Sequence, residues 1–236
     1  MSQSTRTSWT DIPEYREFCE LAATDPDTFA AFRRQPEYHH IVYVSPEDGQ
    51  RYLERLTCVP SAALDATGLP PIYPYETAAG TLMLDPVMIR YCHDRQEIWN
   101  HHGETDGMRI LEIGGGFGGL ARLLAAHCAS YAICDLPEVR HLQDVYLARY
   151  GVSVEDADPT EAYDLVVSTF AFSELYAEVQ AEYADDYLRP TPRGWMICNF
   201  VNPAHDPDDV IALVPGARYE PEEPRTHPAN RVMVWG

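Results

Sequence analysis

The sequence predicts an α/β protein with a Rossmann-like seven-stranded sheet, helices on both faces and an N-terminal helical extension. From Met108 onward, short apolar segments alternate with helical patterns, a rhythm typical of a parallel sheet covered on both sides. A glycine-rich turn, Gly114–Gly119, joins the first apolar segment to the next helical one. The preceding hundred residues show helical spacing without such alternation. We therefore predict an extension or lid over residues 1–107 and a ligand-binding catalytic domain over residues 108–236.

Within the extension, helical spacing predicts a helix that carries Ile12, Tyr15, Cys19 and Ala22. Ser45 followed by Pro46 predicts the capped start of a second helix. Asp85 and Pro86 predict the start of a third, which ends near Gly103. Residues 57–80 lie between the last two and are rich in proline and glycine, so an irregular loop is expected there.

In the second part, four apolar segments predict the parallel strands: Arg109–Ile113, Tyr131–Cys134, Tyr163–Ser168 and Trp195–Phe200. Helices are expected between them over Leu120–His127, from Pro137 onward and over Glu174–Leu188. Two further strands, Ala217–Glu220 and Arg231–Trp235, are separated by a proline-rich loop with no helical pattern. So short a connection predicts an antiparallel pair that closes the sheet.

Composition places the 236-residue chain among ordinary soluble globular proteins, with 45% hydrophobic and 23% charged residues. No apolar run reaches the 18 or so residues that a membrane-spanning helix needs, and the first residues show no secretory signal. The six cysteines are scattered without a CxxC pair, which favours reduced thiols. We expect a cytoplasmic protein that does not bind membranes.

The charge argues against a nucleic-acid substrate. The formal net charge is −20, and all 17 basic residues are arginines. Binding a polyanion depends on clustered cationic side chains, and no basic stripe occurs in the sequence. The expected partner is a small-molecule acceptor, and the sequence is compatible with a homo-oligomer.

The glycine turn is the motif that points to a ligand. Glycines are needed where the backbone turns tightly between a strand and a helix, and where a ligand lies against the main chain. Gly114, Gly116 and Gly119 also satisfy the dinucleotide pattern GxGxxG, so the turn alone does not choose between ligands. A purely structural turn is the alternative, although five glycines in six residues would cost much conformational entropy.

Two carboxylates favour S-adenosylmethionine over a dinucleotide. Glu112 stands two residues before Gly114, where it would repel a pyrophosphate but can hold a ligand ammonium group. S-adenosylmethionine carries an ammonium and a sulfonium but no phosphate. Asp135 ends the next strand, where a carboxylate can accept hydrogen bonds from ribose hydroxyls, as it also does in NAD enzymes. The alternative role of Asp135 is to cap the helix that Pro137 begins.

Four motifs together resemble a family of sugar O-methyltransferases from antibiotic and other natural-product pathways. That family carries runs close to EIGGGYGG, DLPEV and DLVISNYAFSEL, and then a strand that ends in Asn. The matching segments here are Glu112–Gly119 (EIGGGFGG), Asp135–Val139 (DLPEV), Asp164–Leu175 (DLVVSTFAFSEL) and Trp195–Asn199 (WMICN). The resemblance spans roughly residues 68–200, and AFSEL is its most specific part. Thr169 and Phe170 depart from the family's Asn-Tyr pair, which puts the typical sugar substrate in doubt.

This resemblance implies a class I methyltransferase fold and S-adenosylmethionine-dependent transfer of a methyl group to a small molecule, with a sugar hydroxyl as the expected acceptor. The alternatives are an N- or C-methyltransferase and, because of GxGxxG, an NAD-dependent oxidoreductase. The expected cofactor-binding residues are Glu112, Gly114, Gly115, Gly116, Phe117, Asp135, Leu136, Ser168 and Phe170.

The acceptor should lie beyond the carboxyl ends of the strands, near Ser168–Glu174 and Asn199–His205. A hydroxyl acceptor needs a general base or a divalent metal to take its proton; no metal-ligand pattern is apparent, so no metal ligand is assigned. One candidate base is His205, which is equally interpretable as an exposed loop histidine. The other is Glu174, which could act as a base or as a metal ligand; its alternative role is to stabilise the start of a helix, where a carboxylate interacts favourably with the helix dipole. The expected substrate-binding residues are Tyr75, Tyr91, Phe172, Asn199 and Asn202. Packing of the extension onto the sheet is the alternative for Tyr75 and Tyr91.

Overall fold

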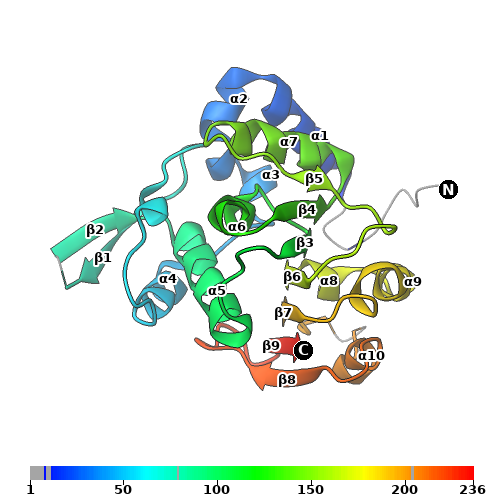
Figure 1. Cartoon of the computed structure of the whole chain (residues 1–236). Coiled ribbons are helices and arrows are strands. Elements are labelled where there is room, and N and C mark those ends of the chain that lie inside the picture. Colours follow the sequence, from blue (N-terminus) through cyan, green and yellow to red (C-terminus); the bar gives the residue numbers. More distant parts are fainter. Residues whose placement is uncertain (1–7, 9–11, 79, 203–204) are drawn as a thin grey trace.

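A seven-stranded sheet runs through the middle of the protein, seen edge-on with its strands stacked from β5 to β8 in Figure 1. The computed structural model describes residues 8, 12–78, 80–202 and 205–236. The strands are β3 (Arg109–Ile113), β4 (Ser130–Cys134), β5 (Glu155–Asp156), β6 (Leu165–Thr169), β7 (Gly194–Cys198), β8 (Arg218–Pro221) and β9 (Arg231–Trp235). They lie side by side in the order β5-β4-β3-β6-β7-β9-β8. The predicted seven-stranded α/β sheet is thus confirmed.

Strand direction follows the expectation as well. β5, β4, β3, β6 and β7 pair in parallel, whereas β9 pairs antiparallel with both β7 and β8. The C-terminal antiparallel pair therefore closes one edge of the sheet, as the short proline-rich connection predicts. The chain order reverses between β3 and β6, and in open α/β sheets ligands bind beyond the carboxyl ends of the strands at such a point.

Helices cover both faces of the sheet because alternate strand residues point to opposite sides. One face packs against α5 (Pro86–His102), α6 (Gly119–Leu124) and α7 (Pro137–Ala148), through strand residues such as Ile110 and Val167. The other packs against α8 (Ala171–Glu174), α9 (Ala177–Tyr183) and α10 (Pro207–Ala212), through residues such as Leu111 and Val166. A 3-10 turn, Ala125–His127, follows α6, and a π turn, Ala184–Leu188, follows α9.

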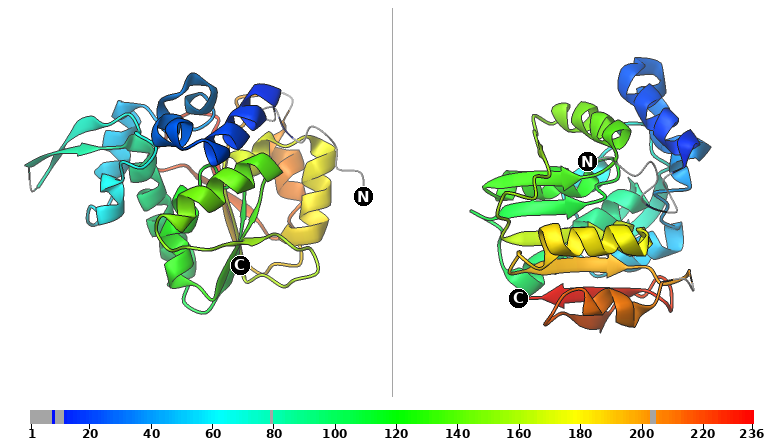
Figure 2. Two further views of the ribbon diagram at one scale, coloured as in Figure 1. Left: turned by 90° about the horizontal axis from the view of Figure 1, so that it is seen from above. Right: turned by 90° about the vertical axis from the view of Figure 1, so that its right-hand side faces the viewer.

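The N-terminal elements are α1 (Pro13–Thr24), α2 (Pro26–Ala31), α3 (Pro36–His39) and α4 (Pro46–Leu53), with 3-10 turns at Phe32–Arg34 and Ser61–Leu64. α1 lies along α7, as both views of Figure 2 show, and Arg16 donates to Glu138 there at 2.8 Å. The Ser45 side chain accepts a hydrogen bond from the backbone of Asp48 and caps α4 as expected. The division at residue 107 falls in the turn before β3 and stays a prediction.

Three details differ from the sequence expectations. The loop expected over 57–80 contains β1 (Tyr73–Thr77), which forms an antiparallel hairpin with β2 (Gly80–Leu84) that projects from the body in Figure 1. Pro74 fits there because this ribbon leaves edge positions without a ladder partner. The helix expected over 174–188 is broken by extended backbone at Leu175 and Tyr176. The two-residue strand β5 was not predicted, since so short a segment shows no periodicity.

No helix in the described part of the chain is long and apolar enough to cross a membrane.

A buried ion pair joins the N-terminal segment to the start of α5. The Asp85 side chain accepts from the backbone N–H groups of Val87 at 3.0 Å and Met88 at 3.2 Å, and so caps the helix. Its second partner is the Arg33 guanidinium, which also lies on the ring of Phe117 at 4.1 Å from the centroid. Asp85 is 1% exposed and Arg33 4%. The orientation of α5 thus depends on a charged contact that is closed to water.

Asp85→Ala should lower the free energy of unfolding by about 3 kcal/mol, because it leaves a buried guanidinium short of its partner and removes a helix cap. Ser45→Ala, which removes only the cap of α4, should cost about 1 kcal/mol. Urea denaturation of both variants measures the difference. Equal losses would show that the Arg33–Asp85 pair adds nothing beyond capping.

Candidate functional site

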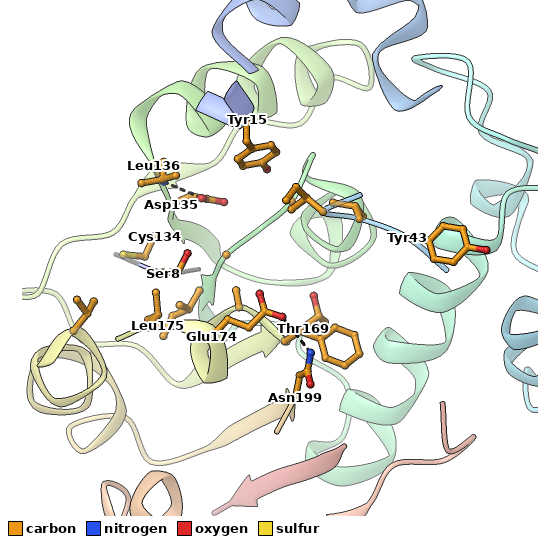
Figure 3. Close-up of a pocket in the computed structure, with 18 of the residues that line it drawn as sticks. Ser8, Tyr15, Tyr43, Cys134, Asp135, Leu136, Thr169, Glu174, Leu175 and Asn199 are labelled. Atoms are coloured by element: carbon orange, nitrogen blue, oxygen red, sulfur yellow. Dashed lines mark hydrogen bonds between the residues drawn. The ribbon is translucent and has the colours of Figure 1, made fainter. Parts of the chain in front are cut away.

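A cavity of about 770 Å³ lies at the carboxyl ends of β3, β4, β6 and β7, where the chain order reverses. Figure 3 shows Asp135 and Tyr15 on its upper side, Glu174, Thr169 and Asn199 on its lower side, and Tyr43 at its far end. Eight residues of the predicted site line it: Tyr91, Gly114, Gly116, Asp135, Leu136, Phe170, Glu174 and Asn199. The sheet therefore brings together residues that are more than a hundred positions apart in sequence.

Packing explains why the turn after β3 is built from glycine. Gly114 has φ +73°, and a Cβ there would stand 2.0 Å from the Cβ of Ala171 at the start of α8. Gly116 has φ +55°, and a Cβ would stand 2.8 Å from the Tyr91 hydroxyl. The turn thus passes so close to α8 and α5 that side chains do not fit. Both glycines also face the cavity, so their backbone is open to a ligand.

Asp135 ends β4 and fastens the glycine turn. One carboxylate oxygen accepts from the Gly115 backbone at 3.0 Å and from the Gln143 amide at 2.8 Å, and the other accepts from Leu136 N at 2.8 Å. Burial raises the pKa of Asp135 to about 6, although these hydrogen bonds favour the charged form. The N-cap residue of α7 is Leu136, and no side chain caps this helix. The alternative in which Asp135 caps α7 is therefore wrong.

Glu112 lies behind the turn and is not among the residues that line the cavity. Its side chain is fully buried, and one oxygen accepts a hydrogen bond from the Tyr131 hydroxyl at 2.9 Å. The other oxygen has no hydrogen-bond partner among the described residues. Burial raises the pKa of Glu112 to about 8, so the folded protein holds it largely protonated at neutral pH. Its predicted contact with a ligand ammonium stays a prediction.

The AFSEL segment joins the ends of β6 and β7. The Ser173 hydroxyl donates to the backbone oxygen of Phe170 at 2.7 Å and accepts from Asn199 N at 2.8 Å. Phe172 and Leu175 are buried in the core beneath α8 and α9. Glu174 points into the cavity, as Figure 3 shows. Ala171 and Leu175 line the cavity as well, so Glu174 is the ionisable group of the segment that is presented to a ligand.

Glu174 is the last residue of α8, not the first residue of a helix as expected from the sequence. One carboxylate oxygen accepts from the Asn199 side-chain amide at 3.4 Å. Burial raises the pKa of Glu174, and the hydrogen bond from Asn199 offsets this only in part. A carboxyl group with a raised pKa in a cavity is suited to proton transfer.

Phe170 combines a strained backbone with a position on the cavity wall. Its φ is +74°, which is unusual for a residue with a bulky side chain. The Arg90 guanidinium lies 5.4 Å from the centre of its ring and 4.9 Å from that of Tyr91. Arg90 also lines the cavity and is 6% exposed. Such strain persists where the surrounding structure holds it, and it concentrates at functional sites.

Other predicted site residues lie elsewhere. Gly115, Phe117, Ser168 and Phe172 pack behind the cavity wall, where the Ser168 hydroxyl donates to Ile113 O at 2.8 Å. Tyr75 is buried on β1 and belongs to the N-terminal packing. Asn202 and His205 stand beyond β7, and neither lines the cavity. Their functional roles stay predictions.

The sequence interpretation missed several lining residues. Tyr15 comes from α1, His40 and Tyr43 from the segment after α3, and His227 from the loop before β9. Gln143 on α7 also escaped notice, although its amide ties Asp135 to the Gly116 carbonyl at 2.9 Å. No motif surrounds these residues, because their placement depends on how distant segments fold over the sheet.

Among the described residues, no group of three or more His, Cys, Asp or Glu side chains is arranged to hold a metal ion.

The sequence matches no protein-family model and has no significant match among curated proteins. Several solved structures are similar in shape. A protein from Pyrococcus horikoshii OT3 aligns over 60% of this chain and 86% of its own, with 12% identity and a TM-score of 0.49. The N-methyltransferase NodS from Bradyrhizobium japonicum, solved with S-adenosyl-L-homocysteine, aligns over 62% and 85%, with 16% identity and a TM-score of 0.47.

The 16S rRNA methyltransferase RsmC from T. thermophilus, solved with AdoMet and guanosine, aligns over 70% of this chain and 50% of its own. Its identity is 14% and its TM-score 0.46. At such identities and scores, these likenesses assign no activity to this chain.

Glu112→Gln should raise the free energy of unfolding above that of the wild-type protein, and this difference should grow as the pH rises. Because the pKa of Glu112 is raised from 4.5 to about 8 in the folded state, the unfolded chain loses this proton first, and wild-type stability falls across that range. Glutamine keeps an acceptor for Tyr131 but does not titrate. We would measure the free energy of unfolding of both proteins by urea denaturation at about pH 5 and about pH 8. The difference in favour of the variant should be a few kcal/mol larger at the higher pH, since one pKa unit corresponds to about 1.4 kcal/mol. If the difference in stability between the variant and the wild-type protein were the same at both pH values, Glu112 would be ionised in the folded protein over this whole pH range.

Proposed function

We propose that this protein is a class I methyltransferase that transfers the methyl group of S-adenosylmethionine to a sugar hydroxyl. The observation that carries the proposal is a cavity at the switch point with the Asp135 carboxylate on one side and the half-buried acid Glu174 on the other. Its volume of about 770 Å³ lies within the usual range for small-molecule sites, about 300–1,000 Å³.

The cavity residues fit the adenosyl part of this cofactor. Asp135 has spare acceptor capacity toward the cavity, and a carboxylate at the end of the second strand suits the two ribose hydroxyls. The backbone of Gly114 and Gly116 is exposed to the same space without an intervening Cβ. Because three hydrogen bonds hold the Asp135 carboxylate, it is oriented before a ligand arrives.

When bound, S-adenosylmethionine would supply an electrophilic methyl group on its sulfonium. The chain's part is to align an acceptor and to remove its proton. Glu174 is the group we assign as the base, because it faces the cavity and burial raises its pKa. Asn199 orients it through the amide hydrogen bond at 3.4 Å. The sequence resemblance, with AFSEL at its centre, supports a sugar hydroxyl as the acceptor.

Two alternatives have weaker support. A dinucleotide-binding sheet usually continues parallel in the order 3-2-1-4-5-6, whereas here β9 inserts antiparallel beside β7. This disfavours the NAD-dependent oxidoreductase. An N- or C-methyltransferase would use the same cofactor site, and an amine acceptor would not depend on Glu174.

Asp135→Ala should weaken the binding of S-adenosylmethionine at least tenfold, since each charge-assisted hydrogen bond contributes about 1.5–3 kcal/mol. Thermal unfolding with S-adenosylmethionine, S-adenosylhomocysteine and NAD identifies the ligand, because a compound at about a hundred times its Kd adds about 2.7 kcal/mol. Asp144→Ala, an outward-facing change on α7, is the control and should bind like wild type. Stabilisation by NAD alone would overturn the proposal.

Glu174→Gln should lower kcat for a hydroxyl acceptor about a hundredfold while leaving cofactor affinity unchanged. Wild-type activity should fall as the pH drops through the raised pKa of Glu174, because protonation removes the base, and the variant should lose this dependence. S-adenosylhomocysteine release is measured with a panel of glycosides and amines. Full activity of the variant on an amine would favour N-methylation and remove Glu174 from the mechanism.

A further inference from the structure

Arg90 is a buried cation on the wall of the main cavity, the space of about 770 Å³ at the carboxyl ends of the strands. Two arginines are among the described residues that line this cavity, Arg16 and Arg90. Arg16 is engaged by the Glu138 carboxylate at 2.8 Å. Neither role proposed above, cofactor binding by Asp135 or proton removal by Glu174, makes use of Arg90.

The Arg90 guanidinium is held on one side and open on the other. Its contact with Asp94 runs from Nε at 3.8 Å, and both Nε and the Asp94 side chain are closed to solvent. The terminal nitrogens Nη1 and Nη2 make no hydrogen bond within the described part of the chain, yet they are not among the buried polar atoms that lack a partner. They therefore keep accessible surface, and Arg90 lines the main cavity. Asp94 balances the charge on the Nε side, which leaves the terminal N–H donors open to a ligand.

Two aromatic rings hold the guanidinium beside the glycine turn. Its central carbon lies 4.9 Å from the centre of the Tyr91 ring and 5.4 Å from that of Phe170. Arginine stacks on aromatic faces and keeps the N–H donors in its own plane free. Tyr91 packs against the turn, because a Cβ on Gly116 would stand 2.8 Å from its hydroxyl. The unusual backbone of Phe170, with φ +74°, thus occurs at a residue whose ring contacts this cation.

We propose that Arg90 binds a carboxylate of the molecule that occupies the main cavity. The terminal nitrogens of a guanidinium match the two oxygens of a carboxylate and can hold them in a bidentate pair. Elsewhere the cavity wall carries the carboxyl groups of Asp135, Glu174 and Glu182, which disfavour a second negative group beside them. Arg90 is thus the place where a ligand carboxylate is most favourable.

This inference rests on the proposed function, which brings two molecules into the cavity. The strand order β4-β3-β6 places Asp135 and Phe170 on opposite sides of the glycine turn that follows β3. A cofactor whose ribose lies at Asp135 and whose chain crosses the turn would bring its amino-acid carboxylate to Arg90. An acceptor that is a sugar acid is the second source of the same group. The strand order favours the cofactor, and the experiment separates the two sources.

Two matched pairs of ligands test for a bound carboxylate in the wild-type protein by isothermal titration calorimetry. The first pair is S-adenosylhomocysteine and its decarboxylated form, which keeps the ammonium group. The second is methyl glucuronide and methyl glucoside, titrated with and without S-adenosylhomocysteine. We expect S-adenosylhomocysteine to bind at least about tenfold more tightly than its decarboxylated form. A preference for the carboxylate in the second pair alone would assign it to the acceptor, and no preference in either pair would overturn the proposal.

Variants then test whether Arg90 is the group responsible. Arg90→Gln is combined with Asp94→Asn, because loss of the guanidinium alone would leave a buried carboxylate without a cation. The preference for the carboxylate should vanish in this double variant and persist in Asp94→Asn alone. Arg16→Gln, which removes the other arginine of the cavity wall, is the matched control and should keep the preference.

A preference that survives in the folded double variant would overturn the assignment to Arg90. The wild-type comparison does not depend on whether that variant folds. If neither adenosyl compound binds the wild-type protein, the proposed cofactor is wrong, and the two glycosides still decide whether the cavity receives a carboxylate. Equal binding of both adenosyl compounds, with no preference between the glycosides, would leave the proposed cofactor standing and remove the role of Arg90.

Discussion

The carboxyl ends of four neighbouring strands are fastened to one another by three polar side chains, and the site depends on this. Asp135 ties the end of β4 to the glycine turn after β3. Ser168 ties β6 to β3 through Ile113 O, and Ser173 ties the segment after β6 to the end of β7 at Asn199. Two backbone hydrogen bonds from residues just beyond the strand ends add to them, from Gly114 N to Cys134 O at 3.0 Å and from Phe170 N to Ile197 O at 2.7 Å. Together these contacts hold the strand ends as a wall around the cavity.

This wall carries an electrostatic cost. Glu112, Asp135 and Glu174 lie close behind or along it, and burial raises the pKa of each. Acids with a raised pKa occur preferentially at functional sites. The strained backbone of Phe170 is a second such cost at the same place. Costs of this kind gather at sites where a protein binds or transforms a ligand.

The fold was largely predictable, because strands and helices leave a periodic signal. The alternation after Met108 and the helix-free connection before Arg231 were enough to predict the parallel sheet and its antiparallel edge. The hairpin at Tyr73 escaped because prolines and glycines dominate its surroundings, and β5 because two residues show no period. The break at Leu175 lies beside the hydrogen bond between Ser173 and Asn199, which links positions far apart in the chain and leaves no local signal.

The site was predictable only where a motif marked it. Gly114, Asp135 and Glu174 belong to local patterns, and all three line the cavity. Tyr15, His40 and His227 line it as well, but their approach depends on how α1 and two loops fold over the sheet, which leaves no local signal. Glu112 shows the converse limit. Its place before the turn predicts a ligand contact, which stays a prediction, but no local pattern showed that its side chain would be buried beside Tyr131.

Among the acids that line the cavity, Asp135 and Glu174 differ in how firmly they are held, and our proposal gives them different roles on this ground. Asp135 accepts three hydrogen bonds of 3.0 Å or less, which fix its orientation and favour its charged form. Burial still raises the pKa of Asp135 to about 6, but its three donors hold the carboxylate in one orientation, which suits recognition of a ligand. Glu174 accepts a single hydrogen bond, at 3.4 Å, and is therefore less firmly oriented. A carboxylate held by one long hydrogen bond can turn toward an acceptor, and on this ground our proposal assigns cofactor binding to Asp135 and the base to Glu174.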